Sequence, residues 1–102
     1  MTEEFGLSRR DLNFIRGVLQ MYPEIEKALV FGSRAKGNFK LESDIDIALN
    51  GKGVGKIISS VKHQLNEGIP LLYHFDVVEY DTISNRDLKD HIDRVGKVLF
   101  RR

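Results

Sequence analysis

One stretch of the chain, residues 30–49, contains a glycine–serine pair followed by two aspartates. Gly32 and Ser33 interrupt an apolar segment, and a glycine at such a break can take a positive φ that lets backbone N–H groups approach an anion. Asp44 and Asp46 alternate with isoleucines, so in a strand both carboxylates share one face. Their Cα atoms are then about 7 Å apart, which suits bracketing a divalent ion. The stretch predicts a phosphate cradle followed by a metal site.

A third carboxylate, Asp76, interrupts an otherwise apolar segment, residues 71–79. Strand alternation places it on the same face as His74. Carboxylate oxygens are hard donors suited to Mg²⁺ or Mn²⁺, and three of them on neighbouring strands would supply a clamp for such an ion. The alternative is that all three acids are solvated or salt-bridged. Glu79 and Asp81 are rivals for the third position.

The glycine–serine pair, ten intervening residues and then Asp44-x-Asp46 resemble the signature of the polymerase-β-type nucleotidyltransferase superfamily. More narrowly, residues 32–37 and 43–46, with the tail at 75–99, are similar to the minimal nucleotidyltransferase (MNT) proteins of bacteria and archaea. Members of that group are often paired with a HEPN-domain protein as antitoxin and toxin. The resemblance covers nearly the whole chain.

The resemblance implies a role for each residue of the motif. Asp44 and Asp46 would be catalytic ligands of the nucleotide-bound ion. Asp76 would complete the metal site and help to deprotonate the attacking hydroxyl. Gly32 and Ser33 would hold the β- and γ-phosphates through backbone N–H groups and the hydroxyl.

The cations and histidines near the motif leave more than one interpretation open. Arg34 and Lys36 either bind the nucleotide by neutralising phosphate charge, contact a partner, or are plain solvated cations. The three histidines have no metal-ligand spacing, and His63 and His91 are expected on exposed or polar helix faces. His74 either touches the nucleotide, orients Asp76, or is an ordinary core or surface histidine.

The composition limits the class of protein. With 102 residues, we expect a single domain, residues 1–102. There is no cysteine, which excludes a disulfide scaffold and fits a reducing cytoplasm. A net charge of +1 gives no bulk electrostatic attraction for nucleic acid. The acidic first residues show no signal peptide or membrane anchor, so a soluble cytoplasmic protein is expected.

Periodicity and capping residues predict the elements that position the motif. Helices are expected from Ser8, over 54–68 and from Asn85 to Gly96, with one helical turn at 34–37. Strands are expected at 27–31, 44–49 and 71–79, with a short edge strand at 98–100. The predicted fold is α/β (α+β), a short mixed β-sheet with helices packed on one face, as in the palm of polymerase β. The active site then lies on the exposed face.

The expected function is metal-dependent transfer of a nucleoside monophosphate, AMP from ATP, to a hydroxyl acceptor. Because the chain has no acceptor domain, we expect a second chain to complete the pocket, and the resemblance implies a HEPN-domain partner inhibited by binding or by adenylylation. Two alternatives stay open: an antitoxin that only binds its partner, and a nucleotidyltransferase acting on a small molecule or RNA. Phe14 and Val18 are either core or the surface of a homo-oligomer.

Overall fold

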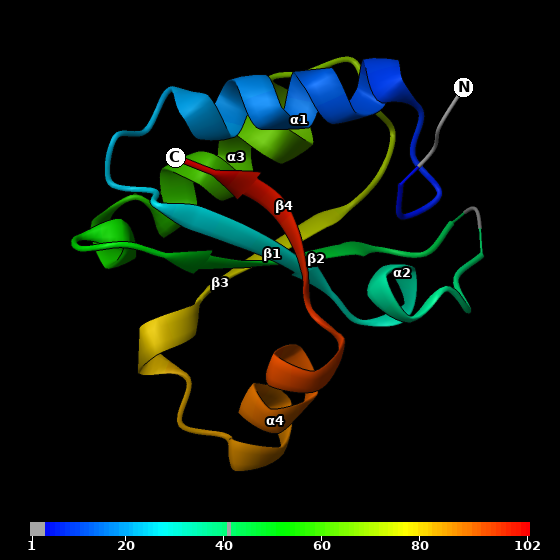
Figure 1. Ribbon diagram of the computed structural model, residues 1–102. Coiled ribbons are helices and arrows are strands. Elements are labelled where there is room, and N and C mark those ends of the chain that lie inside the picture. Colours follow the sequence, from blue (N-terminus) through cyan, green and yellow to red (C-terminus); the bar gives the residue numbers. More distant parts are fainter. Residues whose placement is uncertain (1–3, 41) are drawn as a thin grey trace.

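A four-stranded mixed sheet forms the centre of the protein, in a computed structural model that describes residues 4–40 and 42–102 (Figure 1). The strands are β1 (Lys27–Phe31), β2 (Ile45–Asn50), β3 (Phe75–Glu79) and β4 (Lys97–Arg101). They lie in the order β3-β2-β1-β4. β1 is antiparallel to both β2 and β4, whereas β2 and β3 are parallel. The predicted mixed sheet, with the final strand at its edge, is confirmed.

The first and the last helix begin where their capping residues predict. α1 (Arg9–Gln20) follows Ser8, whose Oγ accepts a hydrogen bond from the backbone N–H of Asp11 at 3.1 Å. α4 (Arg86–Val95) is capped in the same way by Asn85 and ends at Gly96. These local signals were sufficient because a cap satisfies N–H groups that the helix itself leaves without partners.

The connections are short. α2 (Ser33–Lys36) is the predicted single turn after β1. The helix predicted over 54–68 is shorter in the structure, because its first residues form a 3₁₀ turn, η1 (Val54–Lys56). α3 (Ile58–Glu67) follows this turn and provides the crossover that the parallel strands β2 and β3 require. A second 3₁₀ turn, η2 (Tyr80–Thr82), leads from β3 towards α4.

Helices cover both faces of the sheet. One face packs on α1 and α3, and its buried strand residues occupy alternate positions: Ala28, Val30, Ile45, Ile47, Leu49, Phe75 and Val77. On the other face, Phe31 and Ala48 pack against Ile92 of α4. Figure 1 shows α1 and α3 on one side of the sheet and α4 on the opposite side.

The mixed α/β class is confirmed, but the expectation that the helices pack on one face is wrong for α4. This helix has an apolar stripe, Leu88 and Ile92, that must be buried, and Phe31 offers it an apolar surface on the second face. Strand alternation places Asp46 and Asp76 on this second face as well. The carboxylates therefore lie on the face that α4 partly covers, and not on a face left free of helices as predicted.

The third strand is shorter than predicted and begins at Phe75. Its neighbour β2 begins at Ile45, the register partner of Phe75, so the parallel pairing of the two strands starts at this position. On the free edge of β3, the side-chain amide of Asn66 accepts from the N–H of Phe75 and donates to its carbonyl, at 2.8 and 3.0 Å.

Two further expectations can be checked in the fold. Val18 belongs to the core and is not part of a surface for a homo-oligomer. Phe14 is partly buried against the same core. Within the described residues, no helix combines the length and the apolar content that a bilayer span requires.

Candidate active site

Asp46 and Asp76 are neighbours across the parallel pair of strands β2 and β3. On its other side, Asp46 is the register partner of Phe31, the last residue of β1. Gly32 follows immediately and begins the turn into α2. Three strands thus bring the two carboxylates and the glycine–serine turn to one end of the sheet.

Gly32 is in a conformation that favours glycine, with φ of +75° and ψ of −155°. A Cβ built on Gly32 would also overlap Oδ2 of Asp46, so a side chain there would require the carboxylate to move. The break in the strand predicted from the sequence is therefore confirmed, and it places Ser33 in the first turn of α2. The first N–H groups of a helix have no partner within the helix, so this turn can accept an anion.

Negative charge is concentrated at Asp46. Burial, followed by the carboxylates of Asp76 and Asp44, raises the pKa of Asp46 above its ordinary value of 3.8, while His91 and His74 act in the opposite direction. None of the ion pairs formed among residues 4–40 and 42–102 includes Asp46. A bound cation would relieve this repulsion, and carboxylate oxygens are suitable donors for Mg²⁺ or Mn²⁺.

The three acids do not form a closed cluster. In the part of the chain that the structure describes, no group of three histidine, aspartate or glutamate side chains is close enough to hold a metal ion. Asp44 lies just before β2, with its Oδ2 3.6 Å from Nδ1 of His74. Both side chains are largely exposed. His74 therefore contacts Asp44, and among the described residues it forms no hydrogen bond or ion pair with Asp76 that would orient that carboxylate, as one of the sequence interpretations had it.

Asp76 has a cationic neighbour that the sequence did not indicate. Nζ of Lys62, on α3, is 3.2 Å from Oδ1 of Asp76, and each side chain is slightly under half exposed. Val61 and Leu65 bury the core-facing stripe of α3, which leaves Lys62 beside that stripe and next to the outer strand β3. Helical periodicity places Lys62 on the flank of the helix but does not say which strand it meets.

Arg34 is buried, with 2% of its surface exposed. Its Nε donates to the carbonyl of Ser43 at 3.1 Å and its Nη1 to the carbonyl of Phe5 at 2.9 Å. The guanidinium lies 5.0 Å from the ring centroids of both Phe39 and Tyr73. Arg34 thus fixes the loop that leads into Asp44 and is not a solvated cation.

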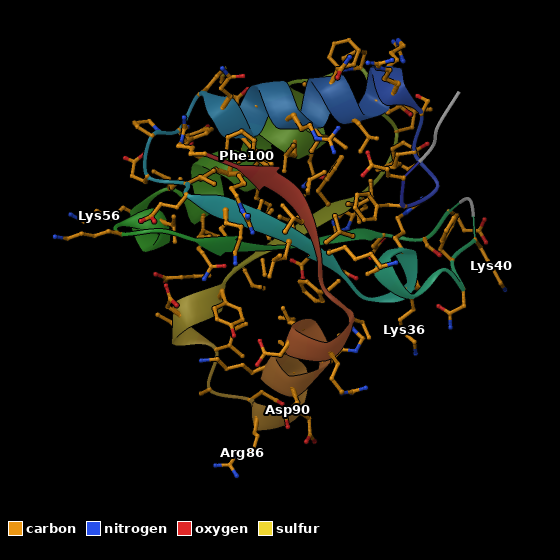
Figure 2. All side chains as sticks on the ribbon, viewed as in Figure 1. Lys36, Lys40, Lys56, Arg86, Asp90 and Phe100 are labelled. Atoms are coloured by element: carbon orange, nitrogen blue, oxygen red, sulfur yellow. The ribbon has the colours of Figure 1, made fainter. Side chains whose placement is uncertain are left out.

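Lys36 is exposed, and Figure 2 shows it at the surface below α2. Direct binding of a phosphate by Arg34 or Lys36 stays a prediction.

His91 of α4 meets the glycine turn, a contact that the sequence analysis missed. Its Nε2 accepts a hydrogen bond from the N–H of Gly32 at 3.0 Å. Its ring lies edge-on to Phe31, with centroids 6.2 Å apart and an interplanar angle of 79°. The apolar stripe of α4 was visible in the sequence, but the surface on which it packs was not.

A mixed sheet that carries acids from adjacent strands beside a glycine–serine turn is the architecture of a nucleotidyltransferase domain. The chain belongs to the polymerase beta, nucleotidyltransferase family, whose model matches residues 13–102. None of the curated proteins is similar enough in sequence to match this chain.

Solved structures with the same fold include several toxin–antitoxin complexes. One, determined with AMP-PNP, has a TM-score of 0.71 and 24% identity, over 89% of this chain and 73% of the other. The MntA–HepT toxin–antitoxin complex has a TM-score of 0.67 and 21% identity, over 93% and 74%. The tri-AMPylated HEPN toxin of Shewanella oneidensis in complex with MNT antitoxin gives 0.66 and 21%, over 92% and 72%. These similarities establish the fold.

Proposed function

We propose that this protein is a metal-dependent nucleotidyltransferase, built as a single minimal domain, that transfers AMP from ATP to a hydroxyl group of a HEPN-type partner protein. The observation that carries the proposal is the position of Asp46. It lies against Gly32 of the turn, beside Asp76 in the sheet, and within the field of Asp44 that helps to raise its pKa. A site of this charge is suited to a divalent ion and the triphosphate that accompanies it.

In the proposed reaction, the acceptor oxygen attacks the α-phosphorus of ATP. A new O–P bond forms, the bond from the α-phosphorus to the bridging oxygen breaks, and pyrophosphate leaves. Asp76 accepts the proton of the attacking hydroxyl. Ser33 holds the terminal phosphates at the turn that Gly32 shapes, while the N–H of Gly32 itself stays bonded to His91. The chain thus acts mainly by positioning and by charge.

Asp46 and Asp76, which are neighbours in the sheet, would hold the metal, and Asp44 would join them once the ion draws its carboxylate away from His74. When bound there, Mg²⁺ or Mn²⁺ supplies charge neutralisation for the triphosphate and its leaving oxygens. The ion pair between Lys62 and Asp76 is partly exposed, so Asp76 can exchange this partner at little cost.

The nucleotide and the acceptor are inferred from the structural neighbours. One was crystallised with AMP-PNP, and another contains an AMPylated HEPN toxin bound to MNT antitoxin. These complexes support ATP as the substrate and a HEPN protein as the partner of this chain. The expected cytoplasmic location stays a prediction.

The test is transfer of label from α-³²P ATP to protein in a lysate of the source cell, with Mg²⁺ or Mn²⁺. Wild type is compared with Asp46→Asn and with Asp90→Asn, a matched change of an exposed acid on α4 that Figure 2 shows on the side of the helix away from the sheet. We expect one labelled band with wild type and Asp90→Asn, reduced at least about 100-fold with Asp46→Asn. No labelled protein from wild type with either metal, or equal label from Asp46→Asn, would overturn transfer to a partner protein by this site. It would leave a nucleotidyltransferase acting on a small molecule or RNA, or a protein that only binds its partner.

A further inference from the structure

The end of β1 is held by a side chain from a distant helix. The N–H of Gly32 donates to Nε2 of His91, 59 positions further along the chain. An imidazole nitrogen accepts a hydrogen bond only when it carries no proton, so this contact requires the tautomer with the proton on Nδ1. The contact joins α4 to the turn that begins the glycine–serine motif.

α4 is fixed independently of His91. Ile92 and Leu88 pack on the second face of the sheet. The hydroxyl of Tyr80 donates to the carboxylate of Asp93, and the Nζ of Lys89 lies 5.0 Å from the centroid of the Tyr80 ring. The helix is therefore attached along its length, and the imidazole is presented to Gly32 from a defined position.

The ring has a second restraint, its edge-on contact with Phe31. Phe31 precedes Gly32 and is the register partner of Asp46. His91 thus contacts the two residues at which the strand ends and the turn begins. A shift of this turn would move both the start of α2 and the glycine against which Asp46 lies.

We propose that His91 is a positioning residue of the nucleotide site. Its imidazole holds Gly32 in the orientation in which Ser33 and the start of α2 face the phosphates, and in which Asp46 fits against the glycine. The inference rests on the proposed function, because it concerns the same site. It adds that α4, which carries none of the motif residues, contributes to nucleotide affinity through one hydrogen bond.

The experiment measures the affinity of the purified protein for Mg²⁺–ATP by isothermal titration calorimetry. His91→Leu keeps a side chain of similar size but removes the acceptor, and His91→Gln places Oε1 where Nε2 lies. His63→Leu, on the exposed face of α3, is the control. We expect His91→Leu to weaken binding about tenfold, and His91→Gln to stay within about threefold of wild type. The control is expected to bind like wild type.

A second measurement follows the Gly32 amide by hydrogen exchange. It should exchange faster in His91→Leu than in wild type and be protected again in His91→Gln. If His91→Leu does not fold, His91→Asn, which is polar but too short to reach Gly32, replaces it.

The outcomes separate the two proposals. No binding of Mg²⁺–ATP by wild type would overturn the proposed function, and the positioning role with it. Binding by wild type with equal affinity in His91→Leu would overturn the role of His91 alone. An equal loss of Mg²⁺–ATP affinity in His91→Gln and His91→Leu would also overturn the role of His91, because the imidazole ring and not its hydrogen-bond acceptor would then matter.

Discussion

Asp46 lies so close to the Cα of Gly32 that a Cβ at position 32 would overlap its Oδ2. The same glycine has a φ of +75°, which disfavours any other residue. The turn and the carboxylate are therefore coupled, and one substitution would disturb both.

Alanine substitutions at three glycines compare two effects at position 32, the backbone strain and the crowding by Asp46. Gly32→Ala is expected to lower the free energy of unfolding by more than about 2 kcal/mol, since the backbone is strained and Asp46 must move. Gly37 has a φ of +90° but open space around it, so Gly37→Ala should cost about 1 kcal/mol. Gly17→Ala, inside α1 and also in open space, should stabilise by about 0.5 kcal/mol. Urea denaturation gives all three values, and an equal cost at positions 32 and 37 would contradict the coupling.

Asp46→Asn is expected to stabilise the protein near neutral pH. Because burial and the neighbouring carboxylates raise the pKa of Asp46 above 3.8 in the folded state, ionisation opposes folding. The stability of wild type is then fully present below the unfolded value and falls as pH rises through the folded one. We expect a gain for the variant of about 0.5 kcal/mol at pH 7, after allowing for solvent screening, that disappears below about pH 4. Thermal unfolding across this range measures it.

Divalent metal should make wild type more stable than Asp46→Asn, the reverse of the order expected without metal. Saturating Mg²⁺ or Mn²⁺ is expected to raise the melting temperature of wild type, since an ion bound only by the folded state stabilises it. Asp46→Asn should not respond. An equal shift in both proteins, or none in either, would contradict a metal site at Asp46.

Lys62→Met tests the cation beside Asp76. The ion pair is partly exposed, so stability should change by less than about 0.5 kcal/mol. Without the competing ammonium, affinity for Mn²⁺ should rise about threefold. Lys56→Met is the matched control, because Figure 2 shows Lys56 extending away from the body of the protein. Weaker binding of Mn²⁺ by Lys62→Met would show that Lys62 supports the site instead of competing with the metal.

Arg34→Lys is expected to cost about 2 kcal/mol of stability. A lysine cannot reproduce the two bonds of the guanidinium to Ser43 and Phe5 or its contacts with two aromatic rings. Lys36→Met, a change at an exposed cation, should leave stability unchanged. If Arg34→Lys kept its stability and lost nucleotide affinity, the guanidinium would act on phosphate and not on the loop.

The sequence predicted the helices and strands more accurately than the contacts between them. Ser8 and Asn85 begin helices as predicted, and β1 spans the predicted residues, because caps and alternation act within a few residues. The third strand was predicted four residues too long, since its start depends on where its neighbour β2 begins.

By itself, the sequence determined that Asp46 and Asp76 lie in strands and that Gly32 ends one, because side-chain alternation and the freedom of glycine are local properties. Only the tertiary structure decided what surrounds them. An amphipathic helix must bury its apolar stripe, but the stripe does not specify which surface will cover it. The packing of α4 on the second face brings His91 to Gly32, and the crossover of α3 brings Lys62 to Asp76.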